Sequence, residues 1–78
     1  MNDLSELTFG QKACGVSFNP DENPVVAMMK TQFAALVDIL HTNQEMTLNP
    51  EIKRMLSMAI TETQTAQMWA VKAITWKY

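Results

Sequence analysis

The last third of the chain, residues 49–78, limits most strongly what this protein can fold into. Asn49 can accept a hydrogen bond from a free backbone N–H at a helix start, and Pro50 suits the first helical position. Neither glycine nor proline interrupts the stretch that follows. The pattern therefore predicts one long helix of about 26 residues, which would extend about 39 Å.

This predicted helix carries two stripes of side chains. The first is an apolar seam at helical spacing, which we expect to face the nearest other helix. The second lies off that seam, so two tryptophans and two methionines would stay uncovered in a chain this small. The seam consists of Ile52, Met55 with Leu56, Ala59, Thr63, Ala66, Ala70 and Ala73 with Ile74. The second stripe consists of Met58, Thr61, Thr65, Met68 with Trp69, and Trp76.

A chain of 78 residues gains little net stability from one core unless a disulfide, a metal or oligomerisation adds to it. Cys14 is the only cysteine, which excludes an internal disulfide, and His41 has no second Cys or His nearby to complete a zinc site. Hydrophobic residues make up 47% of the chain, and seven are methionines, whose flexible side chains suit adaptable interfaces. We therefore predict a homo-oligomer without a metal or cofactor.

Charge and hydropathy exclude several other classes. The net charge of −2 argues against a DNA- or RNA-binding protein, which needs many clustered Lys and Arg residues. The longest apolar runs fall short of the roughly 18 to 20 residues that cross a bilayer. Residues 1–6 lack the basic start and apolar stretch of a signal peptide. We expect a soluble, cytoplasmic protein without a membrane or nucleic-acid partner.

The N-terminal part predicts a short helix. Thr8 and Gln11 have the spacing of a capping box, and Gly15 is placed to end the helix in a left-handed conformation, which predicts about two turns over residues 9–14. Residues 16–18 are expected to be extended, because Asn19-Pro20 follows. Pro24 would clash inside a helix begun at Pro20, so we expect a turn or kinked start at residues 20–23.

A second helical seam begins at Pro24 and continues to about His41, with Val26, Met29, Phe33, Leu36 with Val37, and Leu40. The connector of residues 42–48 is short and polar, so the two long helices should pack as an antiparallel hairpin. The predicted fold is all-α, with a short N-terminal helix and a two-helix hairpin in a single domain of residues 1–78.

Catalytic chemistry has little support in the sequence. His41 at a helix end, with no acid or nucleophile at a defined spacing, is interpreted as a surface residue or a partner of the helix dipole. Cys14, in a short amphipathic helix, is interpreted as a small buried hydrophobe rather than a reactive thiol. The eight carboxylates form no evident pair of acid and base. We predict that the protein is not an enzyme.

Two residues of the N-terminal half are candidates for ligand binding. Lys30 follows the seam residue Met29, so its ammonium should emerge at the seam's edge, where a second subunit would close over it; the alternative is a solvated lysine. Phe18 precedes a helix start, where free N–H groups and an aromatic face can hold a phosphate and stack a base. Its alternative role is to staple the loop onto the hairpin.

The long C-terminal helix carries further candidates. Lys53 and Arg54 lie in its first turn, where the helix dipole disfavours cations, and this placement hints at an anion or an acidic partner. Trp69 and Trp76 share the second stripe, so we interpret them as interface residues, with ligand stacking as the alternative.

Several segments together resemble the bacteriophage anti-CBASS sponge proteins, the second anti-CBASS family, whose hairpin also occurs in the Thoeris anti-defence sponges. The C-terminal signature is MWAVKAIT at residues 68–75, preceded by TETQTA at residues 61–66. Residues 7–13, 15–20 and 33–38, with Val26 and Lys30, are similar to the same family, so the resemblance covers nearly the whole chain.

This resemblance implies a phage protein of the host bacterial cytoplasm that sequesters cyclic nucleotide signals without cleaving them. It implies a compact homohexamer of hairpins, with cyclic dinucleotides such as cGAMP held between paired subunits and cyclic trinucleotides held where three subunits meet. The residues carried over are Phe18, Asn19 and Lys30 for the dinucleotide, and Arg54 with its neighbours Lys53 and Ser57 for the trinucleotide.

The chain also departs from the family pattern. The family's stacking aromatic is usually tyrosine, the segment between Phe18 and Lys30 is longer, and the connector between the helices is shorter. An alternative from another class stays open: a small helical protein–protein interaction or assembly subunit, whose second stripe binds a protein partner.

Overall fold

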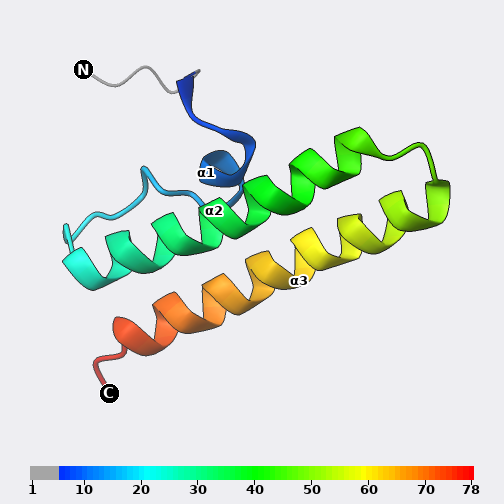
Figure 1. The fold of residues 1–78 in the computed structure, drawn as a ribbon. Coiled ribbons are helices and arrows are strands. Elements are labelled where there is room, and N and C mark those ends of the chain that lie inside the picture. The colour runs from blue at the N-terminus through cyan, green and yellow to red at the C-terminus, as the bar shows by residue number, and fades with distance from the viewer. Residues whose placement is uncertain (1–5) are drawn as a thin grey trace.

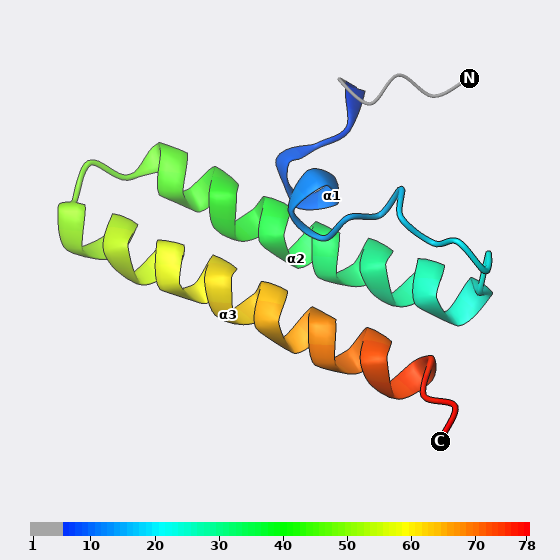
Figure 2. The same ribbon diagram turned by 180° about the vertical axis from the view of Figure 1, so that it is seen from behind.

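The computed structural model describes residues 6–78, and these residues contain three helices and no strand (Figure 1). α1 spans Phe9–Ala13, α2 spans Pro24–Met46 and α3 spans Pro50–Ile74. α2 and α3 lie antiparallel side by side, and α1 crosses the middle of α2, as Figure 1 and the view from behind in Figure 2 both show. The all-α hairpin with a short N-terminal helix is thus confirmed. Residues 1–5, on which most of the signal-peptide expectation rests, lie outside the described residues.

The ends of α1 follow the predicted signals. Thr8 Oγ1 accepts from the N–H of Gln11 at 3.1 Å, and the Gln11 side chain accepts from the N–H of Thr8 at 2.8 Å, which completes the capping box. Gly15 has a φ of 61°, and its N–H donates to the Lys12 carbonyl at 3.2 Å. The N–H of Val16 donates to the Gln11 carbonyl at 3.1 Å, so a Schellman motif ends the helix.

The prediction that residues 16–18 are extended is wrong. Val16 belongs to the Schellman motif, and the N–H of Phe18 donates to the Gly15 carbonyl at 3.0 Å, so the chain turns again at once. The steric effect of Pro20 acts only on the residue directly before it, Asn19, and leaves the earlier residues free to turn.

α2 begins at Pro24, after a turn at residues 20–23 as expected. The N–H of Glu22 donates to the Asn19 carbonyl at 3.0 Å, and Glu22 has a φ of 50°. Asn23 is the N-cap, because its side chain accepts from the N–H groups of Val25 and Val26 at 2.9 and 3.3 Å. Pro20 therefore lies in the turn and does not start a helix.

α2 is longer than predicted. It passes the expected end near His41 and continues to Met46, so the connector is residues 47–49 instead of residues 42–48. The polar residues 42–46 include no glycine or proline, and Gln44 bonds across to α3, donating to the Lys53 carbonyl at 3.0 Å and to Ser57 Oγ. Polarity alone therefore does not stop a helix.

His41 consequently lies inside α2 and not at its end. Its ring stacks on Phe9, with centroids 3.9 Å apart and planes 9° apart, and its Nδ1 lies 3.4 Å from a carboxylate oxygen of Glu45. The interpretation as a helix-end dipole partner is therefore wrong. His41 instead packs the start of α1 onto α2.

The core forms where the three helices meet, around Cys14, Ala34, Val37 and Ile60. Cys14 is buried, as interpreted from the sequence, and burial together with the negative charge of Asp38 raises the pKa of its thiol.

The Asp38 carboxylate on α2 fixes the start of α1. It accepts from the N–H of Gly10 at 2.7 Å and from the Thr8 hydroxyl at 2.7 Å. The remainder of α1 lies against α2 through close contact between the two backbones, which is possible because Gly10 has no side chain to separate them.

Gly10→Ala should displace α1 from α2. A Cβ at this position would lie 2.1 Å from the Ala34 carbonyl oxygen, a backbone atom that cannot move aside without shifting α2. We expect a loss of about 1 to 3 kcal/mol in the free energy of unfolding, measured by urea denaturation. Gly15→Asn is the matched control: a Cβ there meets open space and asparagine tolerates the left-handed conformation, so its cost should be smaller. Equal losses in both variants would contradict the close contact.

α3 has 25 residues, close to the predicted length, but it faces α2 differently than predicted. Thr75 is its C-cap, and residues 76–78 lie beyond the helix. The side facing the rest of the chain centres on Ile60 and Gln67, and Gln64 donates to the Ala13 carbonyl at 3.2 Å. Five members of the predicted seam are instead exposed: Ile52, Met55, Ala66, Ala73 and Ile74. Hydrophobic spacing could not show that two glutamines face inward.

The second stripe of α3 is open to solvent, as predicted. Met58, Met68, Trp69 and Trp76 are all more than half exposed. The molecule is flat, with extents of 44 × 33 × 13 Å, so it is about one helix thick and leaves two broad faces uncovered. Its accessible surface of 5835 Å² exceeds the roughly 4,800 Å² expected of a folded 8.8 kDa monomer.

Candidate functional site

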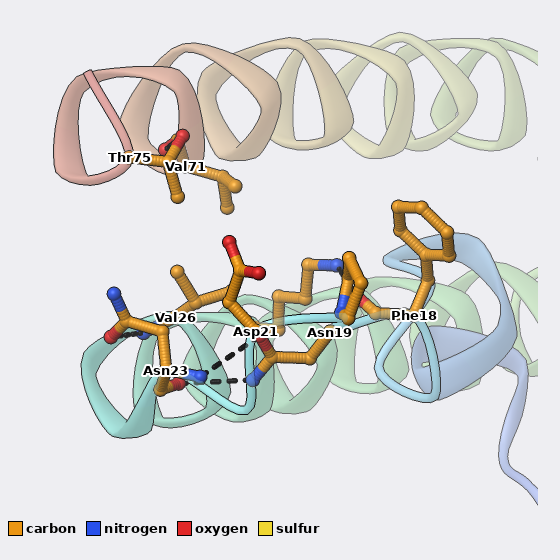
Figure 3. A pocket seen from close by; sticks show the side chains of 9 residues that line it. Phe18, Asn19, Asp21, Asn23, Val26, Val71 and Thr75 are labelled. Carbon is orange, nitrogen blue, oxygen red and sulfur yellow. Dashed lines mark hydrogen bonds between the residues drawn. The ribbon is translucent and has the colours of Figure 1, made fainter. Parts of the chain in front are cut away.

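A cavity of about 230 Å³ lies between the α1–α2 loop and the C-terminal end of α3 (Figure 3). The antiparallel hairpin creates it, because it brings the start of α2 beside the end of α3. Residues of the loop, of the first two turns of α2 and of the last turn of α3 line it. They are Phe18, Asn19, Pro20, Asp21, Asn23, Val26, Lys30, Val71 and Thr75.

Lys30 supplies the positive charge of this cavity. Only 6% of the residue is exposed, and its ammonium donates to the carbonyl of Gly15 at 3.1 Å and to the carbonyl of Phe18. The alternative of a solvated lysine is therefore incorrect, since the chain's own loop covers the ammonium. Within residues 6–78 no carboxylate forms a salt bridge with Lys30, so its charge is balanced by carbonyl dipoles. Such a cation attracts an anion.

Phe18 stands at the mouth of the cavity. Its side chain projects from the loop toward α3 in Figure 3 and is 70% exposed, so it does not staple the loop onto the hairpin. The Lys30 ammonium lies 5.5 Å from the centre of the Phe18 ring. A flat aromatic ligand could stack on the open face of this ring while an acidic group approaches Lys30.

The amide groups of Asn19 and Asn23 hold the rim of the cavity in place. Asn19 Nδ2 donates to the Asn23 carbonyl at 2.9 Å, and Asn19 Oδ1 accepts from the N–H of Asn23 at 3.1 Å. Each polar atom of the Asn19 amide retains further hydrogen-bonding capacity. The structure thus brings together Phe18, Asn19 and Lys30, the three residues proposed from the sequence for one site.

The second predicted set lies at the opposite end of the hairpin. Arg54, Lys53 and Ser57 occupy the first turns of α3, near the connector to α2. The Arg54 guanidinium is paired with Glu51, with an Nε to Oε2 distance of 3.0 Å. This pairing lowers the pKa of Glu51 and raises the pKa of Arg54. In the single chain Arg54 is therefore already engaged by a carboxylate.

The sequence interpretation missed six residues that line the cavity: Pro20, Asp21, Asn23, Val26, Val71 and Thr75. The last two belong to the C-terminal signature but had no chemical pattern to mark them. The predicted hairpin could have indicated them, because antiparallel packing places residues 71 and 75 opposite the start of α2.

A further hollow, of about 460 Å³, lies on the second stripe and is lined by Trp69, Lys72, Ala73 and Trp76. The Lys72 ammonium lies 5.4 Å from the Trp69 ring and 5.9 Å from the Trp76 ring. Both tryptophans are well exposed, so this hollow is a shallow aromatic surface around a cation.

No cluster of three or more potential metal ligands was found among residues 6–78. None of the helices formed by these residues has both the length and the hydropathy needed to span a bilayer.

Fold and site together define a small helical-hairpin protein with a cation and an aromatic ring in one cavity. Residues 12–75 match the family model described as Acb2/Tad1, hairpin domain. The chain therefore belongs to the Acb2/Tad1 hairpin family, which confirms the resemblance to the anti-CBASS sponge proteins. Every residue that lines the cavity of Phe18 and Lys30 lies within the matched region. Comparisons with curated proteins and with solved structures gave no match.

Proposed function

We propose that the protein is a phage anti-defence sponge that binds cyclic dinucleotides, sequesters them intact and thereby blocks CBASS immunity in the host bacterial cytoplasm. The observation that carries this proposal is the convergence of the Lys30 ammonium and the exposed Phe18 ring on one cavity of a family hairpin. A cyclic dinucleotide offers two phosphates and two flat bases, which match a cation and an aromatic ring presented twice. Tight binding alone removes the signal, so the proposal includes no enzymatic step.

The size of the cavity supports a shared site. About 230 Å³ is below the usual range of roughly 300 to 1,000 Å³ for a small-molecule pocket, so one chain would hold only part of the ligand. Two copies related by a twofold axis would each hold one base and one phosphate. A cyclic dinucleotide has this pseudo-twofold form, which is why we place it between paired subunits.

Assembly is part of the proposal. The exposed second stripe and the large accessible surface support a homo-oligomer, which we propose is a hexamer with residues 1–78 as one domain in each subunit. The stripe is also what favours the alternative function, an interaction or assembly subunit that binds another protein.

We also propose that Arg54, with Lys53 and Ser57, binds cyclic trinucleotides where three subunits meet. Glu51 opposes trinucleotide binding, since its carboxylate already accepts the guanidinium hydrogen bonds that a phosphate would need. Binding would exchange the Glu51 carboxylate for a phosphate.

Substitutions of Arg54 and of Glu51 should have opposite effects on cyclic trinucleotide binding. Arg54→Ala should abolish cyclic trinucleotide binding, because a threefold site loses three guanidinium groups at once. Glu51→Gln should tighten it severalfold by releasing Arg54 from its carboxylate. Calorimetry with a cyclic trinucleotide measures both, and cyclic dinucleotide binding is the internal control, since neither residue lines that cavity. Weaker trinucleotide binding by Glu51→Gln would contradict competition by Glu51.

The proposed function is tested with purified protein and a cyclic dinucleotide such as cGAMP. We expect saturable binding by calorimetry, a higher melting temperature with ligand, and recovery of chemically intact ligand after heat denaturation. Recovery of a linear or cleaved product would contradict sequestration. The absence of any binding would leave the alternative, a protein-binding subunit, as the better interpretation.

A further inference from the structure

Asp21 is an unexpected residue in a cavity that we assign to an anion. It lies in the turn that the Glu22 N–H closes with the Asn19 carbonyl, and the paired amides of Asn19 and Asn23 hold this turn. Figure 3 shows its carboxylate directed across the cavity toward Val71 and Thr75 on α3. Among residues 6–78 no side chain or backbone N–H donates to this carboxylate. An exposed carboxylate without a protein donor among the described residues thus faces the space where a ligand would bind.

We propose that Asp21 makes this cavity selective for guanine-bearing cyclic dinucleotides, an inference that rests on the proposed function. An ionised carboxylate only accepts hydrogen bonds, and its two oxygens suit two parallel donors. The Watson–Crick edge of guanine presents two neighbouring donors, N1–H and the N2 amino group. Guanine can therefore donate two parallel hydrogen bonds to the Asp21 carboxylate, as a guanidinium does.

Adenine cannot make this pair. Its Watson–Crick edge places the acceptor N1 beside the N6 amino group, so one carboxylate oxygen would face a lone pair. Asp21 is exposed in the single chain, so the cost arises when a bound base covers it: a ligand that takes water from the carboxylate without donating to it binds less tightly. Asp21 thereby separates the two purines even though Phe18 stacks on either.

The arrangement of the cavity gives each part of the ligand a separate partner. Lys30 and Asp21 come from different segments, the second turn of α2 and the loop before it. Figure 3 shows Phe18 and Asp21 both projecting toward α3 from the loop, with Val71 and Thr75 opposite. A base stacked on Phe18 would extend its edge along the cavity toward Asp21, while its phosphate would approach Lys30. The carboxylate repels every cyclic dinucleotide to a similar degree, so charge repulsion alone does not produce a preference between bases.

The test compares cyclic di-GMP with cyclic di-AMP by calorimetry on the intact protein. We expect the wild-type protein to bind cyclic di-GMP at least tenfold more tightly, because both of its bases can pair with an Asp21. Asp21→Asn should weaken cyclic di-GMP binding at least tenfold and tighten cyclic di-AMP binding, since an amide both donates to and accepts from adenine. Circular dichroism and light scattering check that fold and assembly are kept.

Glu22→Gln is the matched control. It removes one negative charge from the same turn, but Glu22 does not line the cavity, so the guanine preference should persist. Equal binding of both ligands by the wild-type protein would overturn this inference but leave the proposed function standing. The inference would also be overturned if the Asp21→Asn substitution tightened the binding of both ligands equally, because Asp21 would then act only by repulsion. Failure to bind any cyclic dinucleotide would overturn the proposed function and this inference with it.

Discussion

Lys30→Met should reduce cyclic dinucleotide binding at least a hundredfold. Each charge-assisted hydrogen bond between the ammonium and a phosphate is worth about 1.5 to 3 kcal/mol, and a twofold ligand would lose two of them. Methionine keeps a similar length and apolar stem, so cavity shape changes little. Calorimetry with a cyclic dinucleotide measures the loss, and cyclic trinucleotide binding should survive in the same variant.

The same substitution has a structural consequence that the fold explains. Without the ammonium, the carbonyls of Gly15 and Phe18 lose their donor, which should cost about 1 to 3 kcal/mol and speed hydrogen exchange in residues 15–23. Lys12→Met is the control: it removes the same charge from an exposed position on α1 outside the cavity. Similar weakening in both variants would show that Lys30 acts only through net charge and would refute its direct contact with the ligand.

Trp69→Ala should dissociate the proposed homo-oligomer. The Trp69 side chain is 66% exposed in the single chain, so its truncation should hardly affect the hairpin itself. If the stripe is buried between subunits, losing this ring should cost about 3 to 5 kcal/mol per buried site, enough to shift assembly at micromolar concentration. Size-exclusion chromatography with light scattering measures the mass directly.

The control for this variant is Leu48→Ala. Leu48 is 95% exposed in the α2–α3 connector, away from the stripe, so its truncation should leave the assembly intact. A wild-type mass of one 8.8 kDa chain at micromolar concentration would refute oligomerisation. A Trp69→Ala protein that stays fully assembled would place the interface elsewhere on the surface.

Local signals in the sequence determined where most helices begin. Asn23 and Asn49 each precede a proline and cap the following N–H groups with their own side chains, and Thr8 with Gln11 closes a capping box. Gly15 ends α1 because a left-handed residue is needed there. These contacts span only a few residues, so they follow from the sequence whatever else the chain does.

The candidate functional site depended on tertiary packing to a much greater degree. Sequence and family resemblance proposed Phe18, Asn19 and Lys30, but nothing local indicated that the loop would fold over Lys30 and bury its ammonium. Likewise, Val71 and Thr75 join the cavity only because α3 returns beside α2. Contacts between residues more than forty positions apart leave no periodic pattern in the sequence.

Two helix properties were also decided by packing. α2 continues past His41 because Gln44 finds acceptors on α3, and α3 turns Gln64 toward α1 because the Ala13 carbonyl is available there. Hydrophobic spacing predicted that α3 has one buried and one uncovered side, and this was correct. It could not fix the rotation of the helix, because a buried glutamine with a partner is as acceptable as an apolar residue, and the partner exists only in the folded chain.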